Sequence, residues 1–167
     1  MTEENLKIDG VKAIIAPGNG NPRPEDNWNP YVKSALERLG IPTINVKFPD
    51  SVLARRSFWL PFLKELGTNE RTIIIGHSSG AIAAMRYAEK DKILGSVLVG
   101  AYYTDLDDES EKKSGYFDDH WDWELKPSDN AHPEARWVAK NEVYNLLTHP
   151  KDKAFFQDIL FELKNLS

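Results

Sequence analysis

Residues 71–82 carry the feature that most constrains the fold of this chain: a β-branched run, a short G-H-S-S-G turn and an alanine-rich stretch. The run at residues 72–75 is typical of a buried strand, and residues 79–90 place Ala, Ile and Met at helical spacing. A strand can pass into a helix through so short a turn only if glycines stand where the two elements meet. The segment therefore predicts a strand, a tight turn and a helix in direct succession.

Strand-like and helix-like segments alternate on either side of this turn, and the alternation predicts a three-layer α/β sandwich with a mainly parallel sheet. The predicted strands are residues 11–16, 41–48, 71–75 and 96–100. The predicted helices are residues 29–39, 51–66 with an interruption at Pro61, and 79–90. After them we expect a polar, aromatic excursion at 104–127, a helix at 134–140, a strand at 143–147 and a helix at 154–165.

Length and composition limit the class of protein. With 167 residues and 41% hydrophobic content, we expect residues 1–167 to form a single domain, with residues 1–10 flexible. The absence of cysteine excludes disulfides, thiolate metal sites and a cysteine nucleophile. A net charge of -5 predicts no nucleic-acid partner, and the lack of a long apolar run predicts no membrane span. We expect a cytoplasmic protein, with the nucleus as an alternative location.

Ser78 lies at the centre of the G-x-S-x-G pattern, between the predicted strand and the predicted helix. In that context the pattern predicts a nucleophilic serine held above the carboxyl end of a sheet. The backbone N–H of Ser79, at the start of the helix, would point to a developing oxyanion. Ser79 carries the competing hydroxyl but lacks the symmetric glycine spacing. His77 is expected to point away from the reaction centre and to be a packing residue or a supporting residue of the site.

A second oxyanion donor is expected from the loop that follows the first strand. Residues 17–20, P-G-N-G, occupy that position, and Gly18 and Asn19 are the candidate backbone donors. An ordinary tight turn is the alternative interpretation. No Lys-Ser or Lys-Thr pair follows, so the segment is not a phosphate-binding loop.

Five segments of the sequence match one family pattern: PGNG at 17–20, SFWLPFL at 57–63, TIIIGHSSGAIAAMRYAE at 72–89, SGYF at 114–117 and WDWE at 121–124. Together they resemble the retinoblastoma-binding protein 9 family of serine hydrolases. The resemblance covers about residues 11–124. It implies a compact α/β-hydrolase fold without a large lid and a Ser, Asp, His triad in that order along the chain. It also implies Ser78 as the nucleophile and Gly18 or Asn19 near the oxyanion hole.

Downstream of Trp123 the resemblance gives candidates for the acid and the base. Asp129, in the turn before the predicted helix at 134–140, matches the position of the acid, and His149, after the last predicted strand, matches the base. Only five residues separate Trp123 from Asp129, fewer than a strand with its connections takes, so we expect one C-terminal strand of the family pattern to be absent.

Other residues remain open as alternatives for these two roles. His132 and His120 lie in polar segments from which either could reach the nucleophile as the base. The alternatives for the acid follow the strand at 96–100, and they are Asp105, Asp107 and Asp108.

The sequence leaves two functions open. The first is hydrolysis of a small ester or amide, or of a peptide-like substrate, through an acyl-enzyme on Ser78, with no cofactor and no metal. The second is a catalytically impaired protein of the same fold that binds a retinoblastoma-type partner. The family name suggests an L-x-C-x-E segment for that binding, and residues 66–70 read L-G-T-N-E, with Thr68 in place of the cysteine.

Overall fold

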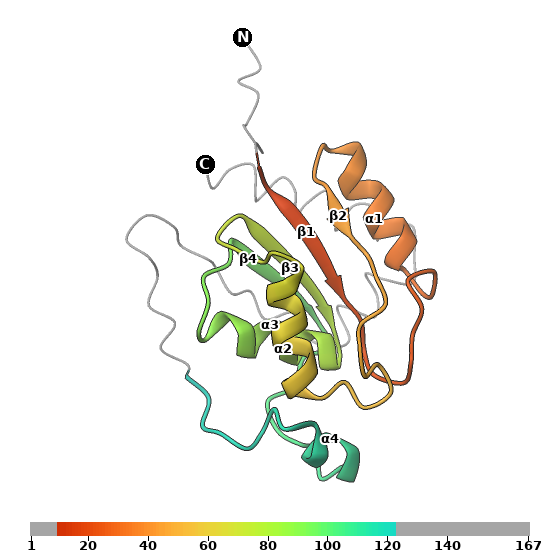
Figure 1. The fold of residues 1–167 in the computed structure, drawn as a ribbon. Coiled ribbons are helices and arrows are strands. Elements are labelled where there is room, and N and C mark those ends of the chain that lie inside the picture. The colour runs from red at the N-terminus through yellow and green to blue at the C-terminus, as the bar shows by residue number, and fades with distance from the viewer. Residues whose placement is uncertain (1–9, 123–167) are drawn as a thin grey trace. The chain divides into compact units, whose positions relative to one another are not determined.

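The computed structural model describes residues 10–122, and its strands and helices alternate along the chain (Figure 1). In chain order the elements are β1 (Lys12–Ala16), α1 (Asn29–Arg38), β2 (Thr43–Ile44), α2 (Arg56–Glu65), β3 (Thr72–His77), α3 (Ser79–Ala88), β4 (Gly95–Val99) and α4 (Glu109–Ser114). All of them belong to one compact unit, Val11–Ala135. The predicted elements at 134–140, 143–147 and 154–165, the expected missing strand and residues 1–9 lie outside the described residues. The single-domain prediction for the whole chain stays a prediction.

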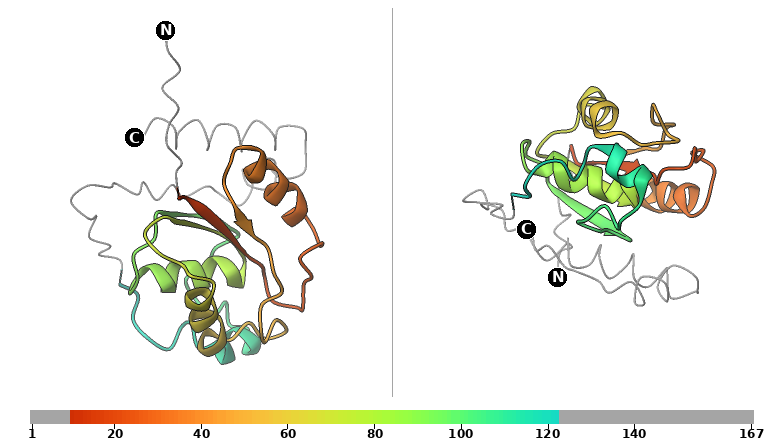
Figure 2. Two further views of the ribbon diagram at one scale, coloured as in Figure 1. Left: turned by 45° about the horizontal axis from the view of Figure 1, so that its top comes forward. Right: turned by 90° about the horizontal axis from the view of Figure 1, so that it is seen from below.

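The four strands form one sheet in the order β2-β1-β3-β4, and every neighbouring pair is parallel. The connection from β1 to β2 steps in one direction, whereas those from β2 to β3 and from β3 to β4 step in the other. Right-handed crossovers then put α1 on one face and α2 with α3 on the other. In the right view of Figure 2, α3 lies between α2 and β4. The predicted three-layer α/β arrangement with a parallel sheet is confirmed for these residues.

Alternate residues of the central strands are buried on both faces of the sheet. Ile14 and its register partner Ile74 belong to the core cluster that contains Trp59 and Leu63 of α2 and Ile82 of α3. Ala13, Ile15 and Ile75, which point to the opposite face, are also buried, as are Val32 and Leu36 of α1. Each fully buried aliphatic side chain stabilises the fold by about 1.5–3 kcal/mol. The continuous apolar runs in the sequence reflect this double coverage.

The strand predicted at 41–48 was too long, because only Thr43–Ile44 pairs with β1. Beyond Ile44 the chain leaves the sheet and buries Phe48 against two aromatic rings of α2, at centroid distances of 4.9 Å to Trp59 and 5.0 Å to Phe62. Tertiary packing of one aromatic side chain therefore ends the strand.

Two helices also differ from their predictions. Helix α2 begins at Arg56 rather than at residue 51, after Asp50 and Ala54 adopt positive φ angles of 49° and 53°, and it continues through Pro61 without interruption. Helix α4 lies within the stretch 104–127 that was predicted to be irregular. Its first turn is capped by Asp108, whose side chain accepts hydrogen bonds from the backbone N–H groups of Ser110 and Glu111.

Candidate active site

Ser78 occupies a sharp turn between β3 and α3. Its φ of 52° and ψ of -119° are values that a residue with a side chain rarely adopts. The backbone on both sides holds it there, because Ser78 N–H donates to the carbonyl of Val99 at 2.9 Å and its carbonyl accepts from Ala81 N–H at 2.9 Å. The turn places Ser78 at the carboxyl end of β3 and at the amino end of α3.

The two flanking glycines are required by space. A Cβ atom on Gly76 would lie 2.5 Å from the carbonyl oxygen of Gly80, and one on Gly80 would lie 2.1 Å from the carbonyl oxygen of Ala16. Both distances are far inside van der Waals contact. The glycine spacing of the motif is thus a direct consequence of how closely β1, β3 and α3 approach one another.

The loop after β1 lies directly against this turn. A Cβ atom on the buried Gly18 would come within 3.4 Å of the Ser78 Cβ atom and 3.2 Å of His77 Nδ1. Farther along, Gly20 N–H donates to the carbonyl of Val52 at 3.2 Å, and Asn21 N–H donates to that of Ser51 at 2.9 Å. The structure therefore brings Gly18, Ser78 and Ser79 together, with Asn19 next in the loop.

His77 and Ser79, the two neighbours of Ser78 in the chain, both have buried environments. The His77 ring makes an edge contact with Trp28, with 6.2 Å between the ring centroids, and burial lowers the pKa of His77. Ser79 is 2% exposed, and its Oγ atom has no hydrogen-bond partner among the described residues. The packing of His77 against an aromatic ring agrees with the supporting role expected for it.

Tyr102 and Glu111 are two further residues of the candidate site, and the sequence pattern indicated neither of them. Burial raises the pKa of Tyr102 to about 12; Ser79 and Ser78 lower it, and Glu111 raises it. In the described part of the chain, none of Ser78, Ser79 and Glu111 makes a hydrogen bond of good geometry with the Tyr102 hydroxyl. Glu111 is 9% exposed, and burial raises the pKa of its carboxyl group, an effect that Tyr102 opposes and Asp108 reinforces.

A weak signal for Glu111 exists in the sequence. The spacing Asp108-x-x-Glu111 matches a helix-capping pattern, in which the glutamate side chain turns back to the start of its own helix. Here it reaches Asn19 instead, whose Nδ2 donates to Glu111 Oε1 at 3.3 Å. A local pattern therefore locates the residue but gives it the wrong partner.

The alternative acids after β4 are used in local structure. Asp105 Oδ1 accepts from the backbone N–H of Asp107 at 3.0 Å, and Asp108 caps α4. Asp107 and Asp108 are exposed. Glu111, in contrast, is buried and accepts a hydrogen bond from Asn19 Nδ2 at 3.3 Å.

Among the histidines considered as the base, only His120 is among the described residues; His132, His149 and the acid Asp129 lie outside them. The His120 side chain is exposed, and its carbonyl accepts from Arg86 Nη1 at 3.1 Å. Arg86 lies seven residues after Ser79, about 10 Å farther along the helix axis. The described part of the chain shows no contact between His120 and Ser78.

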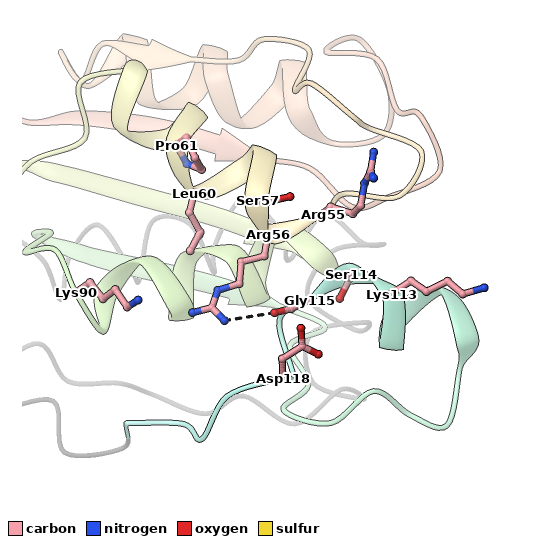
Figure 3. A pocket seen from close by; sticks show the side chains of 10 residues that line it. All are labelled: Arg55, Arg56, Ser57, Leu60, Pro61, Lys90, Lys113, Ser114, Gly115 and Asp118. Carbon is pink, nitrogen blue, oxygen red and sulfur yellow. Dashed lines mark hydrogen bonds between the residues drawn. The ribbon is translucent and has the colours of Figure 1, made fainter.

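A surface pocket of about 580 Å³ lies between the start of α2 and the end of α4. Its basic side chains do not converge: Arg56 bonds the carbonyl of Gly115, whereas Arg55, Lys90 and Lys113 point in different directions (Figure 3). Ser78, Gly18 and Asn19 are not part of its lining. The pocket is therefore separate from the candidate active site.

Neither a metal site nor a membrane span is found in the described part of the chain. Within residues 10–122 no group of three or more His, Asp or Glu side chains is placed to hold a metal ion. No helix over the same residues is long and apolar enough to cross a membrane.

The segment predicted to bind a protein partner forms a compact turn between α2 and β3. Thr68 Oγ1 donates to the carbonyl of Leu63 at 2.5 Å, and Lys12 Nζ donates to the carbonyls of Leu66 at 2.9 Å and Gly67 at 2.7 Å. A segment held in this way would have to open before it bound as an extended peptide.

The chain is similar to known serine hydrolases. It is 41% identical, over 167 aligned positions covering 90% of both chains, to the curated protein "Serine hydrolase RBBP9" of Rattus norvegicus. No protein-family model matches it. Two solved structures are also similar. The ydeN gene product from B. subtilis has a TM-score of 0.48 and 22% identity, over 56% of this chain and 54% of that one. The esterase RhEst1 from Rhodococcus sp. ECU1013 has a TM-score of 0.40 and 21% identity, over 56% and 38%.

Proposed function

The chain belongs to the family of serine hydrolases that includes rat RBBP9, and on that premise we propose that it hydrolyses a small ester or amide through an acyl-enzyme on Ser78. The resemblance seen in the sequence is confirmed by this relationship. The enzymatic function is favoured over the binding function, because hydrogen bonds from Thr68 and Lys12 close the turn between α2 and β3. The retinoblastoma-type partner and the cytoplasmic location stay predictions.

The observation that carries the proposal is the backbone of Ser78, with φ 52° and ψ -119° between two glycines that cannot be replaced without a collision. A backbone held in a sparsely populated region costs about 1–3 kcal/mol and persists where the surroundings impose it, as at active sites. It supports a hydroxyl that is presented at the carboxyl end of the sheet for attack on a substrate.

The proposed reaction has two halves. In the first, Ser78 Oγ attacks the substrate carbonyl carbon and gives its proton to a histidine base. The backbone N–H groups of Asn19 and Ser79 stabilise the oxyanion, and the alcohol or amine leaves with that proton. In the second half, water attacks the acyl-enzyme, the histidine takes a proton from the water, and Ser78 regains its proton as the acid product leaves.

We assign the base to His149 and the acid to Asp129 on the family resemblance. Asp129 would hold the imidazole in the required tautomer and stabilise its charged form. Loss of such an acid lowers kcat by about 10⁴. His132 and His120 remain the alternatives for the base.

The nucleophile is tested by labelling with a fluorophosphonate, followed by intact-mass and peptide mapping. Wild type is expected to gain one adduct at Ser78, and Ser78→Ala none. Ser79→Ala is the matched control, because it removes the neighbouring hydroxyl and leaves the elbow. Folded wild-type protein that shows no Ser78-dependent labelling would contradict the enzymatic function.

The base is tested by the same labelling rate in His149→Ala, His132→Ala and His120→Ala. We expect only His149→Ala to lower the rate, by about 10³ or more. A wild-type rate in this variant, together with a large loss in one of the other two, would move the role to that residue.

A further inference from the structure

Glu111 is an acidic side chain in a place where an acid is costly. It is 9% exposed and lies on the short helix α4, and burial raises the pKa of its carboxyl group, an effect that Tyr102 opposes. A buried carboxylate persists only where hydrogen-bond donors surround it. The direct donor that the structure gives it is Asn19 Nδ2, at 3.3 Å.

Helix α4 is built to hold Glu111 in this position. Asp108 accepts from the Glu111 backbone N–H at 3.2 Å, and Ser114 Oγ donates to the Glu111 carbonyl at 2.6 Å. Just beyond the helix, the carbonyl of the buried Tyr116 accepts from Arg86 Nε at 2.8 Å. The backbone of Glu111 is therefore held by hydrogen bonds on both sides, and its side chain extends from this fixed position to Asn19.

Asn19 stands between two attachments of its loop. On one side, the buried Gly18 packs against Ser78. On the other, the backbone of Gly20 and Asn21 is bonded to that of Val52 and Ser51. The Asn19 side chain adds a third attachment, to Glu111, across 92 residues of sequence.

We propose that Glu111 is a positioning residue of the active site: by holding the Asn19 side chain, it fixes the backbone N–H of Asn19 beside Ser78. This role rests on the proposed function. The glutamate touches no reacting atom and acts through Asn19. Loss of a whole oxyanion donor lowers kcat by about 10²–10³, and a donor that is only loosened costs less, about tenfold.

The test measures kcat and KM for p-nitrophenyl acetate in Glu111→Ala, Asn19→Ala and the double variant. Each single variant is expected to lose about tenfold in kcat with KM unchanged, and the double variant no more than either one, because both remove the same contact. Glu111→Gln is expected to retain more activity than Glu111→Ala, since its amide oxygen still accepts from Asn19. Glu109→Ala, which removes an exposed carboxylate from the same helix, is the matched control.

Wild-type kcat in Asn19→Ala or in Glu111→Ala would overturn the inference, and so would losses that multiply in the double variant. Thermal unfolding shows which variants are folded. If Glu111→Ala does not fold, Asn19→Ala and Glu111→Gln decide, because the Asn19 side chain is exposed and Gln keeps the shape of Glu. Ser78→Ala in the same assay separates the two proposals. If Ser78→Ala keeps its activity, the proposed function is contradicted. If Ser78→Ala loses its activity but Asn19→Ala has wild-type kcat, only the role of Glu111 is contradicted.

Discussion

Gly80, in the first turn of α3, lies so close to the end of β1 that a Cβ atom at this position would fall 2.1 Å from the carbonyl oxygen of Ala16. Gly80→Ala is therefore expected to lower the free energy of unfolding by about 3 kcal/mol, because backbone atoms must move to relieve the overlap. Urea unfolding measures the loss. Gly95→Ala is the control, since a Cβ atom there meets nothing within 4 Å, and it is expected to change stability by less than about 0.5 kcal/mol. Equal effects would contradict the packing described for the elbow.

For Ser78 we predict that two substitutions abolish activity equally but differ in their effect on stability. Its positive φ of 52° strains any residue that has a Cβ atom, whereas glycine adopts it freely. Ser78→Gly and Ser78→Ala should both lose all Ser78-dependent hydrolysis, but the glycine variant should unfold with a free energy about 1 kcal/mol higher than the alanine variant. Chemical denaturation of the two variants checks this, and an alanine variant as stable as the glycine variant would show that the elbow is unstrained.

Tyr102 is expected to contribute to activity through its hydroxyl group. The phenol is protonated at neutral pH, as that of any tyrosine is, and burial, which raises its pKa to about 12, keeps it so at higher pH; it is therefore able to donate a hydrogen bond. Removing one hydrogen-bonding group typically costs about 1 kcal/mol, so Tyr102→Phe should lower kcat/KM about fivefold. Tyr103→Phe, on the exposed neighbour, is the control. A Tyr102→Phe enzyme with unchanged kcat/KM would show that the hydroxyl plays no part in the reaction.

Glu111 predicts a pH dependence of stability. Since burial raises the pKa of this carboxyl above its ordinary 4.5, the folded state binds the proton more tightly than the unfolded state. Its contribution therefore favours folding at low pH and is lost as the pH rises through the folded-state pKa. Glu111→Gln, which cannot ionise, should gain stability relative to wild type between about pH 4 and about pH 8. Urea unfolding of both proteins at the two pH values measures this gain. A variant that loses stability relative to wild type as the pH rises would contradict the pKa shift.

Arg86 is the main attachment of the segment after α4. The guanidinium is 1% exposed, donates to the carbonyls of Tyr116, Asp119 and His120 and to Glu89, and stacks 3.6 Å from the centroid of the Trp121 ring. Arg86→Met removes the guanidinium that pairs with the buried Glu89 and donates to these carbonyls, and it should cost about 3–5 kcal/mol in unfolding free energy. Arg23→Met removes an exposed arginine that also pairs three residues away, and it should leave the unfolding midpoint near that of wild type. Similar midpoints for the two variants would refute this role of Arg86.

The sequence predicts the elbow and most of the sheet because those features depend on neighbouring residues. The positions of β1, β3, α1 and α3 follow from apolar periodicity, and the turn at Ser78 follows from two glycines at fixed spacing. What the sequence did not reveal depends on distant contacts. The early end of β2 follows from the burial of Phe48 against α2, and the contact of Glu111 with Asn19 joins residues 92 positions apart.

The same distinction applies to the candidate site. Spacing alone locates Ser78, Ser79 and Gly18, because the motif and the first strand are continuous in sequence. Tyr102 and Glu111 enter only when the polar stretch after β4 folds back and α4 forms there. A charged, aromatic stretch without a period carries no signal for that return.

The edge contact between Trp28 and His77 gives this enzyme an optical probe of its own. The two ring centroids are 6.2 Å apart, and His77 directly precedes Ser78 along the backbone. Indole emission responds to the polarity and charge around the ring, so a variant that keeps Trp28 as its sole tryptophan would report acylation of the neighbouring serine as a change in fluorescence. Turnover could then be followed on unmodified substrates, without a chromogenic leaving group.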